Sequence, residues 1–173
     1  MSRRSYLISL ATPEQIPMLA AIEIAEAAKF PLDIIPEEIR SGSVPVSQLK
    51  AAQSEGRLWV ACDAGQVPVG FAIARLEGDD GFLQELDVHP DHQRQGLGRR
   101  LIAAVTEWSQ AQGCRRLTLT TFASVPWNAP YYERLGFRVL ELEELSNSLQ
   151  SQLESEISQG MKDRVAMVFP LIQ

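Results

Sequence analysis

The segment from Glu85 to Arg99, Glu-Leu-Asp-Val-His-Pro-Asp-His-Gln-Arg-Gln-Gly-Leu-Gly-Arg, places the strongest constraint on how this chain folds. A strand-like run leads into a loop with two glycines, and helical periodicity begins directly after it. Such a turn points several backbone N–H groups at one spot, and the helix N-terminus adds partial positive charge. Glycine there removes the Cβ that would hold a phosphate oxygen away from the amides. The segment therefore predicts a pyrophosphate site.

Two other phosphate motifs do not fit this loop. A nucleoside-triphosphate loop needs Lys and Ser or Thr after its second glycine, whereas Arg99 and Arg100 follow Gly98 here. A dinucleotide-binding loop needs a third small residue where Leu101 stands. Glycines and arginines also occur at strand-to-helix turns that bind no ligand, so the glycine pair alone leaves that alternative open.

Composition narrows the classes of partner. The 173 residues are 45% hydrophobic and 22% charged, as in an ordinary soluble domain. The net charge of −6 argues against general affinity for nucleic acid or an anionic membrane. No apolar run is long enough for a signal peptide or a membrane span. Cys62 and Cys114 form no CxxC pair, which predicts two reduced thiols and a cytoplasmic location.

The rest of the chain alternates between helical and strand patterns. Helices are expected over residues 14–29, 37–54 (with a break near 42–45), 98–112 and 126–135. Strands are expected over residues 6–10, 58–62, 67–75, 82–88, 117–121, 137–140 and 164–169. No internal repeat or linker is visible, so the pattern predicts a single α+β or mixed α/β domain over residues 1–173.

Residues 141–159 carry an apolar stripe. Leu142, Leu145, Leu149, Leu153 and Ile157 recur at three- and four-residue steps among polar residues. This spacing predicts one amphipathic helix. The sequence favours packing of its stripe on the body of the protein, with a homodimer interface as the alternative.

Two motifs between Leu83 and Phe137 have the order and spacing of a known family. The first is Gln93-Arg94-Gln95-Gly96-Leu97-Gly98, and the second is Tyr132-Glu133-Arg134-Leu135-Gly136-Phe137. Together they resemble the GNAT superfamily, the Gcn5-related N-acetyltransferases, over residues 6–169. The resemblance implies the GNAT fold: a central, mostly antiparallel sheet of six to seven strands, flanked by helices. It also implies that the sheet splays open between the strands at 82–88 and 117–121, with acetyl-coenzyme A in the cleft.

The resemblance assigns residues to the cofactor. It implies that backbone groups of Leu86 and Val88, on either side of Asp87, pair with the pantetheine arm. Asn128 is expected to contact the same arm, or else to hydrogen-bond locally at a helix start. The backbone amides of the loop are expected to hold the pyrophosphate; these belong to Arg94, Gln95, Gly96, Leu97, Gly98 and Arg99.

The resemblance also implies which residues transfer protons in the reaction. Tyr132, rather than Tyr131, is expected beside the cofactor sulfur, where it donates a proton to the departing thiolate. A backbone N–H near Leu86 or Val88 would polarise the thioester carbonyl. Glu85 borders the cleft and is the candidate base, although it could instead bind substrate or face solvent. Asp87 shares its side of the strand by simple alternation.

These features predict an acetyl-coenzyme A-dependent N-acetyltransferase that acetylates a primary amine of a small molecule or peptide by direct attack. Thr120 stands where some family members carry a glutamate base. The alternative is therefore a catalytically degenerate coenzyme A-binding regulatory or interaction protein. No metal is expected, because His89 and His92 lack a third ligand nearby. Trp127 is a candidate wall of the acceptor pocket.

Overall fold

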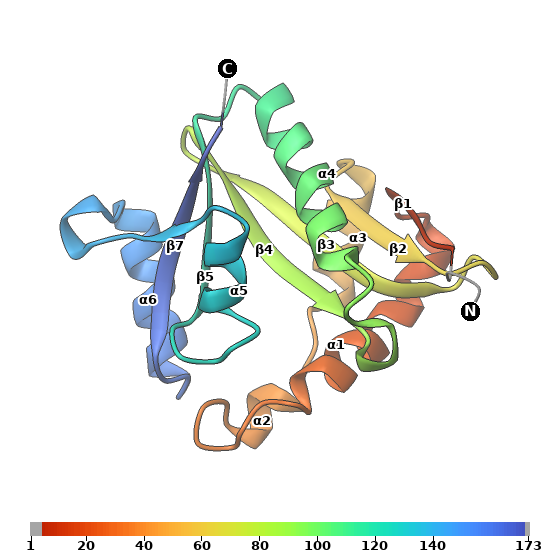
Figure 1. The fold of residues 1–173 in the computed structure, drawn as a ribbon, viewed down its shortest axis with the longest axis horizontal. Coiled ribbons are helices and arrows are strands. Elements are labelled where there is room, and N and C mark those ends of the chain that lie inside the picture. The colour runs from red at the N-terminus through yellow and green to blue at the C-terminus, as the bar shows by residue number, and fades with distance from the viewer. Residues whose placement is uncertain (1–4, 172–173) are drawn as a thin grey trace.

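The computed structural model describes residues 5–171, and within them a seven-stranded sheet is flanked by helices (Figure 1). The strand order is β1-β2-β3-β4-β5-β7-β6, and only the pairing of β4 with β5 is parallel. The strands are β1 (Leu7–Leu10), β2 (Leu58–Cys62), β3 (Pro68–Glu77), β4 (Asp80–Val88), β5 (Arg116–Phe122), β6 (Arg138–Val139) and β7 (Arg164–Pro170). The expected mixed, mostly antiparallel fold is confirmed.

Helices cover both faces of the sheet. The α-helices are α1 (Leu19–Ala27), α2 (Glu37–Arg40), α3 (Val46–Ser54), α4 (Leu97–Ala111), α5 (Ala129–Arg134) and α6 (Asn147–Ser158). The 3₁₀ turns are η1 (Pro13–Met18), η2 (Pro90–His92) and η3 (Leu142–Glu144). Strand alternation divides the core, because successive side chains point to opposite faces. Trp59 of β2 packs with α4 residues, whereas Leu58 and Val60 pack with residues of α1 and α3.

The sheet opens between β4 and β5. These strands pair only at Gly81 with Leu117 and at Phe82 with Thr118, and beyond that point they diverge (Figure 1). On the other edge of β4 the register shifts, which leaves Gln84 as an extra residue opposite β3. A bulge of this kind bends a strand. The expected splay is therefore present, and a β-bulge accompanies it.

Residues 141–159 do not form the single helix that their spacing predicts. Leu142 lies in η3 and is 79% exposed, and Leu145 is extended with ψ 129°. Ser146 then caps α6, since its side chain accepts a hydrogen bond from the Leu149 N–H. Leu149 is buried against the sheet, whereas Ile157 is 57% exposed. The apolar stripe is thus shorter than predicted, because a serine cap restarts the helix partway along it.

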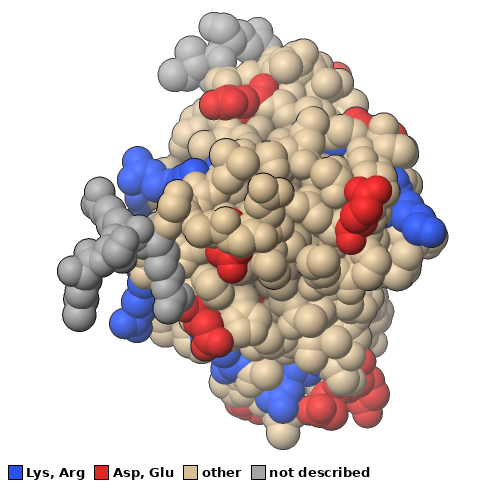
Figure 2. Space-filling model, turned by 90° about the vertical axis from the view of Figure 1, so that its right-hand side faces the viewer, with Lys and Arg blue, Asp and Glu red and all other residues tan. Residues whose placement is uncertain are grey.

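The outer edge of the sheet carries few charged side chains (Figure 2). Leu7 and Leu10 of β1 are 65% and 53% exposed. Nothing in the structure shows what covers this edge, and the homodimer stays a prediction. No helix in the described part of the chain combines the length and apolar character needed to cross a bilayer.

Candidate active site

The gap between β4 and β5 belongs to a cavity of about 860 Å³. This volume lies within the range of small-molecule and cofactor sites. The cavity brings together most of the residues that the sequence predicts for the site, namely Glu85, Leu86, Asp87, Val88, Arg94, Gly96, Leu97, Gly98, Asn128 and Tyr132. The predicted loop residues Gln95 and Arg99 have exposed side chains and do not line it. A role for their backbone amides stays a prediction.

The glycine loop at the start of α4 suits a diphosphate. Gly96 is the N-cap of α4 and has φ 75°, a left-handed conformation that glycine adopts without strain. A Cβ on Gly98 would stand 2.7 Å from the Tyr131 hydroxyl oxygen, so a side chain there would fill the cradle. The N–H groups of the first helical turn have no intrahelical acceptor. The loop therefore presents free donors at a positive helix end, next to a surface that only glycine leaves open.

Gln93 links this loop to two neighbouring elements. Its side-chain nitrogen donates to the Val88 carbonyl at 3.1 Å. Its side-chain oxygen accepts from the Lys29 ammonium at 2.6 Å, just beyond α1. The loop is thereby fixed both to the end of β4 and to the segment that closes the other side of the cavity.

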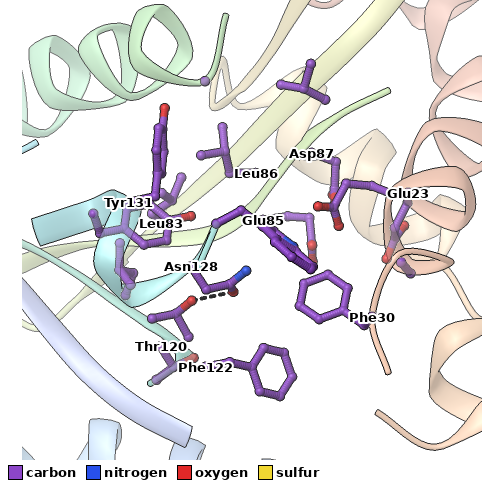
Figure 3. Close-up of a pocket in the computed structure, with 18 of the residues that line it drawn as sticks. Glu23, Phe30, Leu83, Glu85, Leu86, Asp87, Thr120, Phe122, Asn128 and Tyr131 are labelled. Atoms are coloured by element: carbon purple, nitrogen blue, oxygen red, sulfur yellow. Dashed lines mark hydrogen bonds between the residues drawn. The ribbon is translucent and has the colours of Figure 1, made fainter. Parts of the chain in front are cut away.

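Two carboxyl groups of β4 point into the cavity. Glu85 and Asp87 lie on the same side of the strand, and Figure 3 shows both near Glu23 of α1. Burial raises the pKa of Glu85 to about 8, and the charge of Glu23 contributes. Burial, followed by the charge of Glu85, also raises the pKa of Asp87 well above its ordinary value. The site thus holds, in Glu85, an acid that exchanges its proton near neutral pH, as acid–base catalysis requires.

Two further carboxyl groups come from α1 and were not predicted from the sequence. Burial raises the pKa of Glu26 to about 7, although the charge of Lys29 opposes this shift. Burial also raises the pKa of Glu23, against a 2.8 Å hydrogen bond from the Val44 N–H. A signal was present, because each acid stands four residues after a buried residue of the same segment, Leu19 or Ile22.

Tyr132 lies in the same cavity as Glu85. Burial raises the pKa of its phenol, and the neighbouring Tyr131, Asp87 and Glu85 raise it further. Tyr132 therefore keeps its proton at neutral pH and can donate it. Its ring packs edge-on against Phe137, with centroids 5.6 Å apart. Tyr131 packs over Gly98 instead, which separates the positions of the two tyrosines.

Asn128 is the N-cap residue of α5, as the helix-start interpretation places it, but its side chain makes no hydrogen bond to the first turn of that helix. Its side-chain oxygen accepts a 2.6 Å hydrogen bond from the Thr121 hydroxyl of β5 (Figure 3). Asn128 therefore holds the α5 end of the cavity to β5. Its contact with the cofactor stays a prediction.

A buried glutamate occupies the place beside Thr120. The Thr120 hydroxyl donates to Glu156 of α6 at 2.7 Å, and Arg164 donates to the same carboxylate at 2.9 Å. Burial opposes ionisation of Glu156, but the hydrogen bond and charge of Arg164 prevail and lower its pKa. Glu156 was not predicted from the sequence, although it lies seven residues after the buried Leu149 and hence on the same helix face.

Aromatic side chains close the cavity away from the loop. The Phe30 ring lies 5.3 Å from Phe122 and 5.5 Å from Trp127, measured between centroids. Trp127, the candidate wall of the acceptor pocket, lines the cavity. The ammonium of Lys29 stands 4.8 Å from the centre of the Trp127 ring.

The histidines before the glycine loop have local partners. His92 Nδ1 lies 3.0 Å from the Tyr6 hydroxyl, and His89 Nδ1 accepts a hydrogen bond from the Asp91 N–H at 3.2 Å. Within residues 5–171 there is no group of three or more His, Cys, Asp or Glu side chains arranged to hold a metal ion.

Comparison with known proteins agrees with this geometry. An aminoglycoside N(6′)-acetyltransferase type 1 from Stenotrophomonas maltophilia is 41% identical over 75 residues, which are 38% of this chain and 49% of that protein. The chain thus spans about half the length of this relative. The ribosomal protein bS18-alanine N-acetyltransferase of Escherichia coli strain K12 is 32% identical over 102 residues, which are 58% of this chain and 69% of that protein.

A solved structure shows the same fold over nearly the whole chain. The N-acetylglutamate synthase from Neisseria gonorrhoeae, complexed with coenzyme A and N-acetyl-glutamate, superposes with a TM-score of 0.72 at 20% identity. The match covers 98% of this chain and 36% of that one. The model of the acetyltransferase (GNAT) family matches residues 21–137, which include most of α1, the glycine loop and α5. The chain therefore belongs to the acetyltransferase (GNAT) family.

Proposed function

We propose that this protein is an acetyl-coenzyme A-dependent N-acetyltransferase that acetylates a primary amine of a small molecule or peptide. The observation that carries the proposal is that Glu85 and Tyr132 line one cavity, which also reaches the glycine loop of α4. The names of the two relatives, an aminoglycoside acetyltransferase and an alanine acetyltransferase, support an amine acceptor.

The chain offers two kinds of backbone contact to the cofactor. Amides of residues 94–99 would bind the diphosphate at the N-terminus of α4. The edge of β4 that faces away from β3, at Leu86 and Val88, would hold the pantetheine arm. Acetyl-coenzyme A supplies the acetyl group and a thiol leaving group.

Glu85 and Tyr132 would then move the protons. Glu85 accepts a proton from the acceptor ammonium, which frees the nitrogen lone pair for attack. Its pKa of about 8 makes it a stronger base than an ordinary carboxylate. The Tyr132 hydroxyl donates a proton to the departing sulfur. Cys62 and Cys114 are buried in the core and do not line the cavity, which supports direct attack over an acyl-cysteine route.

The alternative function, coenzyme A binding without catalysis, rests on the missing acid at position 120. Thr120 is committed to Glu156 and Arg164 and can supply no base. Glu85, however, provides a carboxyl group with a raised pKa in the same cavity. This observation favours the catalytic function.

Replacement of Tyr132 tests the proposal. Tyr132→Phe keeps the ring but removes the proton donor, so kcat should fall by about 10²- to 10⁴-fold. Release of thiol from acetyl-coenzyme A, measured over a panel of amines, gives kcat, and calorimetry gives the affinity for acetyl-coenzyme A. The affinity should change little, and the matched variant Tyr131→Phe should lose much less activity. An unchanged kcat in Tyr132→Phe, or no turnover of any amine by the unaltered protein, would contradict the proposal.

A further inference from the structure

Glu23 and Glu26 of α1 take no part in the proposed proton transfers, yet both line the cavity. They stand three residues apart on a helix, so their side chains share one face. Glu85 and Asp87 lie opposite on β4, and Figure 3 shows Glu23, Glu85 and Asp87 around one space. Two elements that are distant in the sequence therefore each bring a pair of acids to the same part of the cavity.

One of these acids is incompletely bonded. Asp87 is only 5% exposed, and its Oδ2 atom has no hydrogen-bond partner among the described residues. The Asp87 carboxyl has a hydrogen bond with Glu85, but this leaves its Oδ2 atom without a donor. A buried carboxyl oxygen without a donor costs free energy, and native proteins rarely leave one in this state. An N–H-rich ligand beside Asp87 would supply the missing donor.

The two cations whose charges act on the acid pairs, Lys29 and Arg164, make their direct contacts elsewhere. Arg164 pairs with Glu156 at 2.9 Å, and Lys29 donates to Gln93 at 2.6 Å. Within the described residues, no Lys, Arg or His lies within 4.0 Å of the carboxylates of the acid pairs on α1 and β4. The charges of Lys29 and Arg164 offset the negative charge of these acids only in part, since the pKa values of Glu26 and Glu85 remain raised, and a cationic ligand can neutralise the rest.

The neighbouring aromatic wall also suits an ammonium group. The Lys29 ammonium already lies over the Trp127 ring at 4.8 Å, a cation–π distance. Phe30 and Phe122 extend this wall. Apolar ring faces beside carboxylates can bind an alkylammonium group, with the rings on its carbon chain and the acids on its charge.

We infer that the acceptor is a small molecule with at least two ammonium groups, one held by Glu85 and Asp87 for reaction and the other held by Glu23 and Glu26. This inference rests on the proposed function and specifies its substrate class. A monoamine would leave one acid pair without a counter-charge, whereas a dication matches both pairs. Small diamines, polyamines and amino sugars share this chemistry.

A substrate series tests the inference. Diaminoalkanes from diaminopropane to diaminohexane are compared with monoamines of the same chain length, and spermidine and kanamycin form separate arms that identify the preferred skeleton. The value of kcat/KM for the best diamine should exceed that of its monoamine by about tenfold or more, the effect of one charged contact. Glu26→Gln should reduce this preference about tenfold. Glu107→Gln, an equal charge change on the exposed side of α4, should leave it unchanged.

Calorimetry separates this inference from the proposed function. Binding of diaminobutane at neutral pH should release protons, because a cation lowers the raised pKa values of Glu26 and Glu85. The measured heat should then depend on the ionisation enthalpy of the buffer. If diaminobutane binds with release of protons but no amine is acetylated, the inferred ligand class is supported and the proposed function is contradicted. If monoamines and diamines are turned over equally, or if a peptide with only its terminal amine is preferred, the inferred substrate class is contradicted and the N-acetyltransferase function is supported.

Discussion

Glu85 and Glu156 are the same residue type in the same cavity, but their surroundings give them opposite protonation behaviour. Glu156 accepts hydrogen bonds from Arg164, Gln152 and Thr120, and its pKa is lowered although burial opposes this. Glu85 faces other acids, and burial raises its pKa to about 8. Glu156 therefore remains an anion that positions neighbours, whereas Glu85 can gain and lose a proton in the working range.

The pH profile follows from Glu85. A base must be ionised, so kcat/KM should rise as pH increases and level off above about 8. The charges of Glu23 and Glu26 oppose the ionisation of Glu85, whereas a hydrogen bond with the Asp87 carboxyl and the charge of Arg164 favour it. Steady-state rates between pH 6 and about 9.5, measured with an acceptor of known pKa, would show this rise of kcat/KM with pH. If kcat/KM of Glu85→Gln rises with pH in the same way, the rise belongs to a group other than Glu85.

The sequence identifies site residues where a local motif places them, and it misses those that depend on long-range packing. Glu85, Gly98 and Tyr132 stand in or beside recognisable motifs, and all three line the cavity. The contribution of α1 depends on its packing against β4, far along the chain. Strand or helix spacing can show that Glu23 lies on a buried face, but it cannot show which acids it meets there.

At the level of elements, agreement is best where a strand, a tight turn and a helix follow one another. The expected strand at 82–88 and helix at 98–112 correspond to β4 and α4 within two residues at each end. The segment 141–159 fails because its apolar spacing continues through a break. Ser146 and the polar residues after it are a helix-start signal that outweighs this periodicity.

Gly98 tests the strand–loop–helix element. Gly98→Ala would place a Cβ 2.7 Å from the Tyr131 hydroxyl oxygen, so either the tyrosine or the first turn of α4 must shift. Displaced amides would weaken acetyl-coenzyme A binding about tenfold, the loss of roughly one charge-assisted hydrogen bond. Calorimetric titration measures this, and Gly65→Ala, in a turn with ordinary space around it, is the control. Equal affinity in both variants would show that the loop does not hold the diphosphate.

For the whole molecule, the acid pairs make stability depend on pH. Glu26 and Glu85 have folded-state pKa values of about 7 and 8, above the ordinary 4.5, so the folded state binds more protons than the unfolded state in between. The stabilisation is complete below about 4.5 and is lost as pH rises through about 8. We expect the melting temperature of the ligand-free protein to fall between pH 5.5 and about 8.5.

Glu26→Gln should flatten this decline, because it removes one titrating group from the window. The variant should melt at a higher temperature than the unaltered protein at the alkaline end, and Glu107→Gln serves as the matched control. Calorimetric scans in buffers of constant ionic strength measure both. A melting temperature that stays constant across the window would show that these acids ionise in the folded protein as freely as in water.

The parallel ladder between β4 and β5 is only two residue pairs long. The strands thus form two half-sheets, β1-β2-β3-β4 and β5-β7-β6, which are joined only at Gly81 and Phe82 of β4. A ligand bound between the diverging ends of β4 and β5 contacts both half-sheets. A ligand that hydrogen-bonds to β4 on one side and packs against β5 on the other would replace the hydrogen bonds that these strands do not make with each other. The coenzyme would then serve the architecture as well as the reaction.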